Sequence, residues 1–95
     1  MTVRWTRRRA LRSLEELADF IAEDNPDAAD AMVSRLLRAA EALGKTPEMG
    51  RRGRVDGTRE LVVPGSSYIL AYEIAVDEIW ILLVCHGAQR WPDRF

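Results

Sequence analysis

The stretch RELVVPGSSYILAYEIAVDEIWILLVCHGAQRWP, from Arg59 to Pro92, decides the fold of this 95-residue chain. It holds three runs rich in apolar and aromatic residues, separated by Pro64-Gly65-Ser66 and by Val76-Asp77. Runs of this length with turn residues between them are typical of strands that follow one another in hairpins. The stretch therefore predicts three antiparallel strands, at Arg59–Val63, Tyr68–Ile74 and Glu78–His86.

The last of these strands is apolar on both faces, because Ile79 to Cys85 contains no charged residue. One face is expected to meet the helices, and the other to be covered by loops or a second chain, or left open as an apolar groove. The register decides what that groove contains. In one register it is lined by Trp80, Leu82, Val84 and His86; in the opposite one His86 turns away.

The first half of the chain predicts a short strand followed by two helices. Thr2–Thr6 has strand-like alternation, and Thr6 is placed to cap a helix from Arg7 to about Glu23. Asn25 and Pro26 begin a second helix, whose apolar stripe continues to Leu43. Gly44 is predicted to end it as a left-handed C-cap. The short link between the helices makes them an antiparallel hairpin.

The order strand-helix-helix-strand-strand-strand predicts an α+β fold, in which a helical hairpin packs on one face of a four-stranded antiparallel sheet. A chain of 95 residues is long enough for a single core, so residues 1–95 are expected to form one domain. The hydrophobic fraction of 47% argues against disorder, and no apolar run is long enough to span a membrane.

The N-terminus is basic but has no apolar segment after it, so no secretory signal is expected and a cytoplasmic protein is predicted. Cys85, the lone cysteine, is interpreted as a small buried hydrophobe. With a single cysteine and a single histidine, His86, neither a disulfide framework nor a metal cluster is expected, and no cofactor is predicted.

Charge is segregated along the chain, although the net charge is only −1. A basic block without acids precedes an acidic block from Glu15 to Asp30. These charges oppose the dipole of the first helix, at ~0.3–1 kcal/mol for each exposed group. A partner that uses them is one interpretation, and screened surface charge is the other. The basic block consists of Arg4, Arg7, Arg8, Arg9 and Arg12.

Four stretches, in this order, resemble the RelE/ParE superfamily of bacterial type II toxins: DNPDAADAM, PEMGRRGRVDGTRELVV, YILAYEI and EIWILLVCHGAQRWP. Together they cover nearly the whole chain. The resemblance implies a small toxin that a cognate antitoxin protein wraps and inactivates in a hetero-oligomer. RelE-like members cut mRNA in the ribosomal A site, whereas ParE-like members poison DNA gyrase.

The resemblance also bears on the target. Metal-independent RNA cleavage needs a base, cations at the phosphate and an acid. His86, Arg59 and Arg54 are the candidates if the protein is a ribonuclease. However, the family's strand arginine falls at Ile69, and the arginine that often follows the last strand falls at Gln89.

No tyrosine follows Tyr72 either, so the terminal aromatic residues lack a phenolic proton. These departures favour a ParE-like toxin that poisons gyrase. The alternative is a RelE-like mRNA endonuclease, and a third reading is a non-toxic binding module. Whether the protein is an enzyme stays open.

The remaining candidates are contact residues. The loop from Lys45 to Thr58 is long for a compact domain, and such loops are usually functional or mobile. Its arginines are interpreted as contacts to nucleic acid, ribosome, gyrase–DNA or an acidic antitoxin segment, with solvated surface as the alternative. His86 is either a base or acid, a binding contact, or a strand-end residue bonded to the turn. The candidate target or phosphate contacts are Arg51, Arg52, Arg54 and Arg90, and the candidate antitoxin groove is Trp80, Leu82 and Val84.

Overall fold

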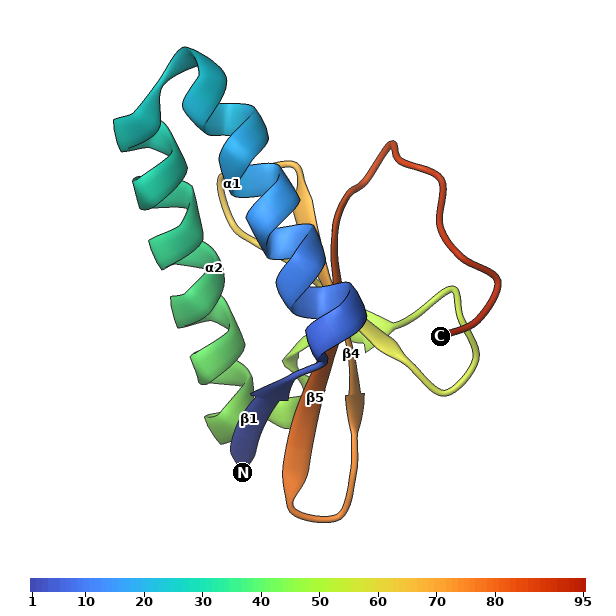
Figure 1. The fold of residues 1–95 in the computed structure, drawn as a ribbon. Helices are drawn as coiled ribbons and strands as arrows, with labels where there is room; N and C mark the ends of the chain where they lie inside the picture. Colours follow the sequence, from blue (N-terminus) through green and yellow to red (C-terminus); the bar gives the residue numbers. More distant parts are fainter.

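A computed structural model describes the whole chain, Met1 to Phe95 (Figure 1). The two helices lie against one face of a sheet, and the C-terminal residues leave the last strand on the other side (Figure 1). Neither helix has the length and apolar character that a membrane crossing needs. The elements are β1 (Thr2–Trp5), the π-helical turn η1 (Arg7–Leu11), α1 (Arg12–Asp24), α2 (Pro26–Lys45), the 3₁₀ turn η2 (Pro47–Met49), β2 (Arg51–Arg52), β3 (Arg59–Val62), β4 (Tyr68–Ile74) and β5 (Glu78–His86).

The α+β fold with its helical hairpin is confirmed, but two details of the sheet differ from the prediction. The sheet has five strands, in the order β1-β5-β4-β3-β2, and β1 runs parallel to β5. The sequence pattern missed β2 because two residues carry no periodicity. It missed the direction of β1 because this strand pairs with the last strand of the chain, so no hairpin turn sets its orientation.

The predicted N-caps of both helical segments are confirmed. The Thr6 hydroxyl accepts a hydrogen bond from the Ala10 N–H at 3.0 Å, and Asn25 Oδ1 accepts one from the Ala28 N–H at 3.1 Å. The first segment begins with a widened turn, since the Leu11 N–H donates to the Thr6 carbonyl five residues back at 2.9 Å.

Gly44 is not the left-handed C-cap that the sequence predicts. Helix α2 continues to Lys45, and only Gly57 and Gly65 have positive φ. A Cβ atom on Gly44 would lie 2.6 Å from the Met1 carbonyl oxygen. This glycine is therefore explained by the close approach of the N-terminal strand to α2.

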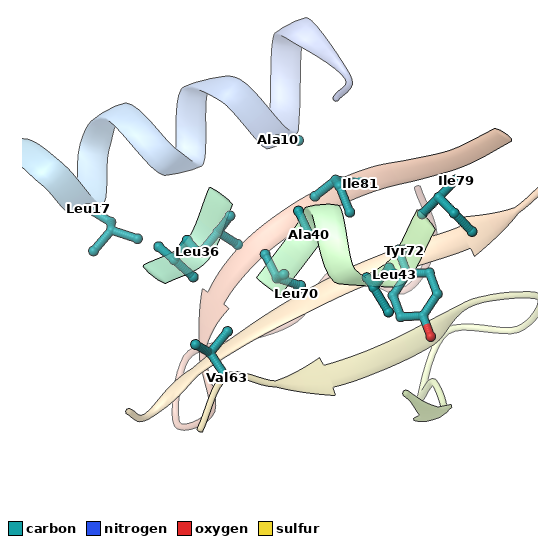
Figure 2. Close-up of a cluster of buried hydrophobic side chains, with 11 residues drawn as sticks. Ala10, Leu17, Leu36, Ala40, Leu43, Val63, Leu70, Tyr72, Ile79 and Ile81 are labelled. Atoms are coloured by element: carbon teal, nitrogen blue, oxygen red, sulfur yellow. The ribbon is translucent and has the colours of Figure 1, made fainter. Parts of the chain in front are cut away.

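The core lies between the helical hairpin and the sheet (Figure 2). Tyr72 is fully buried in it, with its hydroxyl donating to the Pro47 carbonyl at 2.6 Å and accepting from the Gly50 N–H at 3.0 Å. The helices contribute Ala10, Leu17, Leu36, Ala40 and Leu43, and the sheet contributes Val63, Leu70, Tyr72, Ile79, Ile81 and Val84.

A β-bulge resolves the register question for β5. Ala71 pairs with Leu83 and Tyr72 pairs with Ile81, so Leu82 is an extra residue on β5. Side chains before and after the bulge consequently change face, and both Ile81 and Val84 point into the core. Neither of the two simple registers considered from the sequence applies to the whole strand.

Replacing Gly44 with alanine tests the close packing of β1 on α2. Alanine normally stabilises a helix interior by ~0.5–1 kcal/mol relative to glycine, but here the contact with the Met1 carbonyl is expected to cost ~1–3 kcal/mol. We expect Tm to fall, by roughly 4–8 °C for each 1 kcal/mol in a domain of this size. A rise in Tm would contradict the close contact between Gly44 and Met1. The variant Ala42→Gly, at an exposed position of the same helix, measures how much the difference in helix propensity between alanine and glycine contributes by itself.

Candidate functional site

The main pocket lies between α1, the end of β5 and the C-terminal segment 87–95, and has a volume of about 930 Å³. Its apolar lining includes Leu17 and Phe20 from α1, Leu83 and Val84 from β5, and Trp91 from the C-terminal segment. Phe20 is 71% exposed, so a large apolar side chain is available to a partner here. Polar groups border this lining: Arg9, Ser13, Glu16, His86, Gln89 and Arg90.

The pocket exists because β1 covers only part of the β5 edge. β1 pairs with Glu78 to Ile81, and the rest of β5 has no strand neighbour on that side. Side chains satisfy two backbone donors there: Val84 N–H donates to Ser13 Oγ at 3.0 Å, and His86 N–H donates to Gln89 Oε1 at 2.6 Å. These bonds protect the exposed edge of the sheet.

His86 lies at the pocket and is partly engaged by its own turn. Its Nδ1 accepts a hydrogen bond from the Ala88 N–H at 3.1 Å, and its ring meets the Tyr68 ring edge-on at 5.8 Å. Acceptance at Nδ1 places the proton of the neutral imidazole on Nε2. The sequence alternative of a strand-end histidine bonded to the turn describes this arrangement, and Nε2 is the nitrogen left for a ligand.

The loop arginines converge on one buried carboxylate. Glu60 is only 3% exposed and accepts hydrogen bonds from Arg51 Nη2 at 3.2 Å and from Arg54 Nε and Nη2 at 3.0 and 3.1 Å. The Arg54 backbone N–H donates to it as well, at 2.8 Å. Burial by itself raises the pKa of the Glu60 carboxyl, but the hydrogen bonds from Arg54 and Arg51 outweigh burial and hold the pKa below its ordinary value.

Arg54 also anchors the C-terminal segment. Its guanidinium lies 3.9 Å from the centre of the Trp91 ring, a cation–π contact that ties this segment to the Glu60 cluster. Arg9 holds the same segment from the other side, with its guanidinium 5.3 Å from the Phe95 ring centre and a hydrogen bond of 3.4 Å to the Arg94 carbonyl. The segment thus crosses from η1 to the loop before β3 and forms one wall of the pocket.

The predicted catalytic trio of His86, Arg59 and Arg54 is not assembled in this structure. Arg59 donates to the Gly50 carbonyl at 2.7 and 3.1 Å and to the Glu48 carbonyl at 3.1 Å. Arg59 pairs with β4 at Tyr72 and His86 pairs with it at Tyr68, four residues away. At ~3.3 Å per residue, this separates their backbones by roughly 13 Å along the strand.

The predicted contact arginines are divided between two faces. Arg51 points to Glu60, whereas strand alternation directs Arg52 to the opposite face, opposite Arg59 in the pairing of β2 with β3. Arg52 and Arg90 are both exposed, and Arg90 lines the pocket.

The predicted groove residues do not share a face. Trp80 is half-buried beneath Arg4, whose guanidinium lies 5.2 Å from the ring centre. Leu82 is the buried bulge residue, and Val84 belongs to the core. Of the three, only Val84 borders the pocket.

Sequence reasoning missed three features of this site: the α1 wall with Phe20, the C-terminal wall with Trp91, and Glu60. Glu60 had a readable signal, since it is an acid inside an apolar strand that directly follows an arginine-rich loop. Cys85, predicted to be buried, is 2% exposed, and burial raises the pKa of its thiol.

Comparisons with known proteins point in one direction. The sequence model of a family described as ParE toxin of type II toxin-antitoxin system, parDE, matches residues 3–91. A Sinorhizobium fredii protein with the name "Putative toxin Y4kP" is 47% identical over 90 residues, which are 95% of this chain and 92% of that protein. Toxin RelE2 of Caulobacter vibrioides is 36% identical over 85 residues, which are 90% of this chain and 93% of that one.

A solved structure described as "Chromosomal ParDE TA system from P. aeruginosa" has the same fold. The TM-score is 0.79 at 24% sequence identity, and the match covers 90% of this chain and 95% of the other. The predicted α+β arrangement of the RelE/ParE type is thereby confirmed.

The Glu60 cluster predicts a specific acid sensitivity. Because the folded-state pKa of Glu60 is lowered, its contribution to stability is complete above the ordinary glutamate pKa of about 4.3 and is lost as pH falls through the lower folded-state value. We expect Glu60→Gln to be less stable than the wild type at pH 7 and to lose less stability on acidification. Urea unfolding at several pH values measures this. Glu73→Gln, at an exposed position on β4, should keep the wild-type acid response; an identical response in Glu60→Gln would contradict the assignment.

Proposed function

The chain belongs to the ParE toxin family of type II toxin–antitoxin systems, and we propose that it inhibits bacterial growth by poisoning DNA gyrase in the cytoplasm unless a cognate antitoxin is bound. The antitoxin is proposed to place an apolar segment in the pocket between α1 and β5. No cofactor takes part in this proposal.

The observation that carries the antitoxin proposal is the open apolar pocket. Phe20 and Leu17 on α1 face a free stretch of β5 across a space of about 930 Å³. Apolar pockets with a polar border are common binding sites for amphipathic segments of a partner protein. Arg9 and Arg90 at this border favour a segment with acidic residues beside its apolar ones.

We favour gyrase over mRNA as the target because of the contacts that the guanidinium groups of Arg54 and Arg59 make. Arg54 is held by Glu60 and Trp91, and Arg59 is held by backbone carbonyls. Neither is free to clamp a scissile phosphate without breaking bonds that organise the sheet edge. A ribonuclease needs these charges to be preorganised around the phosphate, so a binding role toward a protein target is favoured.

A second candidate is RelE-like mRNA cleavage, which one observation favours. His86 lines the pocket together with Arg9 and Arg90, so one imidazole and two guanidinium groups border the same space. For Nε2 to act as a base, the imidazole would have to give up its bond from the Ala88 N–H and move its proton to Nδ1, and the arginines would bind phosphate.

Purified gyrase and purified ribosomes distinguish the two targets. We expect the protein to produce gyrase-dependent DNA breaks and to leave a defined message on ribosomes uncut. His86→Ala should keep the gyrase effect within about a factor of two, because the imidazole has no part in that mechanism. Cuts at codon positions, abolished by His86→Ala, would establish the ribonuclease instead.

Phe20→Asp tests the pocket as the antitoxin site. The side chain is 71% exposed, so folding should be preserved, while loss of a buried aromatic contact in the complex is expected to weaken antitoxin affinity by ~10²-fold or more. The control is Val76→Asp, at an 87% exposed position in the β4–β5 turn outside the pocket lining. Titration calorimetry with the product of the adjacent antitoxin gene measures both; equal affinities would place the antitoxin elsewhere.

A further inference from the structure

The basic block at the start of α1 is not accounted for by the pocket. Of its arginines, only Arg9 lines the pocket. Arg7, Arg8 and Arg12 are exposed, and all three lie on the widened turn or directly after it. Residues four or five positions apart share a side of such a turn, so Arg7 and Arg8 lie one turn before Arg12.

Few carboxylates of the protein pair with these arginines. Arg7 and Arg8 form no ion pair or side-chain hydrogen bond, and Arg12 has a long contact of 3.7 Å to Glu16 between two exposed side chains. Exposed pairs of this kind contribute little. No acid occupies the first turn of η1, so the guanidinium groups also face the positive end of the helix. The repulsion between these guanidinium groups and the positive end of the helix does not stabilise the fold.

The C-terminal segment extends the basic block in space. The hydrogen bond from Arg9 to the Arg94 carbonyl, and its contact with Phe95, bring Arg94 beside η1. Arg90 borders the same pocket as Arg9. The arginine surface therefore comprises Arg7, Arg8, Arg9, Arg12, Arg90 and Arg94, and the carboxylate of Glu16 accompanies it.

We infer that the arginine surface binds the phosphate backbone of double-stranded DNA. The inference goes beyond the proposed antitoxin pocket and would give a gyrase-directed toxin a direct contact with the DNA that gyrase holds. The attraction between guanidinium groups and backbone phosphates does not depend on base sequence, so we expect binding to duplex DNA of any sequence.

An acidic protein segment fits this surface less well. Protein interfaces centre on buried apolar or aromatic residues with few charges, whereas Arg7, Arg8 and Arg12 do not line the apolar pocket. An acidic segment in the pocket would reach Arg9 and Arg90 but would leave the other arginines unused. A polyphosphate backbone engages all of them through long-range attraction and short bidentate contacts.

Fluorescence anisotropy with a labelled 20-base-pair DNA tests the inference on the purified chain. We expect salt-dependent binding, with a dissociation constant on the order of 10⁻⁴ to 10⁻⁶ M near physiological salt. The double variant Arg7→Gln/Arg8→Gln should bind roughly ten-fold more weakly, and the slope of log K against log salt should become shallower by about 1.8, since each lost phosphate contact removes ~0.9.

The control is Arg38→Gln/Lys45→Gln, which makes the same change in net charge at two exposed positions of α2, a helix that contributes no residue to the arginine surface. It should retain wild-type affinity and slope. Equal weakening by both double variants, or the absence of DNA binding, would overturn the inference, as would tighter binding to duplex RNA or to polyglutamate of similar length. A protein that still poisons gyrase but fails these assays would leave the proposed function standing and remove only the DNA contact.

Discussion

The buried carboxylate of Glu60 on β3 joins the neighbouring strand β2, the loop before β3 and the C-terminal segment. It holds Arg51 of β2 and Arg54 of the loop before β3, and through Arg54 it positions Trp91 of the C-terminal segment. Removing a buried ionised partner from such a cluster is costly because the remaining charges lose their compensation. This single charge holds Arg51 and Arg54 and, through Arg54, one wall of the pocket.

Two kinds of surface follow from this construction, and they differ in physical character. The pocket is apolar and walled by α1, β5 and the C-terminal segment, which suits a partner that buries area. The arginine surface is charged and exposed, which suits a partner that brings counter-charge. Arg9 belongs to both, because it lines the pocket and holds the C-terminal segment. A bound antitoxin would thus lie directly beside the surface through which DNA is proposed to bind.

Most of the fold could be predicted from short sequence patterns. The caps at Thr6 and Asn25, the helical stripes and the three C-terminal strands each have a signal within a few residues, and all of them are present. The predictions that were wrong concern contacts between segments far apart in the sequence. The place and direction of β1, the reason for Gly44 and the bulge at Leu82 depend on contacts between distant segments. The candidate site was harder to predict than the fold. The sequence does not show that the side chain of Arg54 is bound to Glu60, or that the side chain of Arg59 is bound to backbone carbonyls.

The pairing of β1 with β5 has a consequence for the synthesis of the protein. Residues from the two ends of the chain form adjacent strands, whereas the helical hairpin and the β3–β4 pair need only near neighbours. Contacts of such long sequence separation form late, because the closure entropy of the whole intervening chain opposes them. In a nascent chain from which β5 has not yet emerged, β1 has no strand to pair with, and the C-terminal wall of the pocket is also missing. The pocket would therefore be complete only after β5 and the C-terminal wall have left the ribosome.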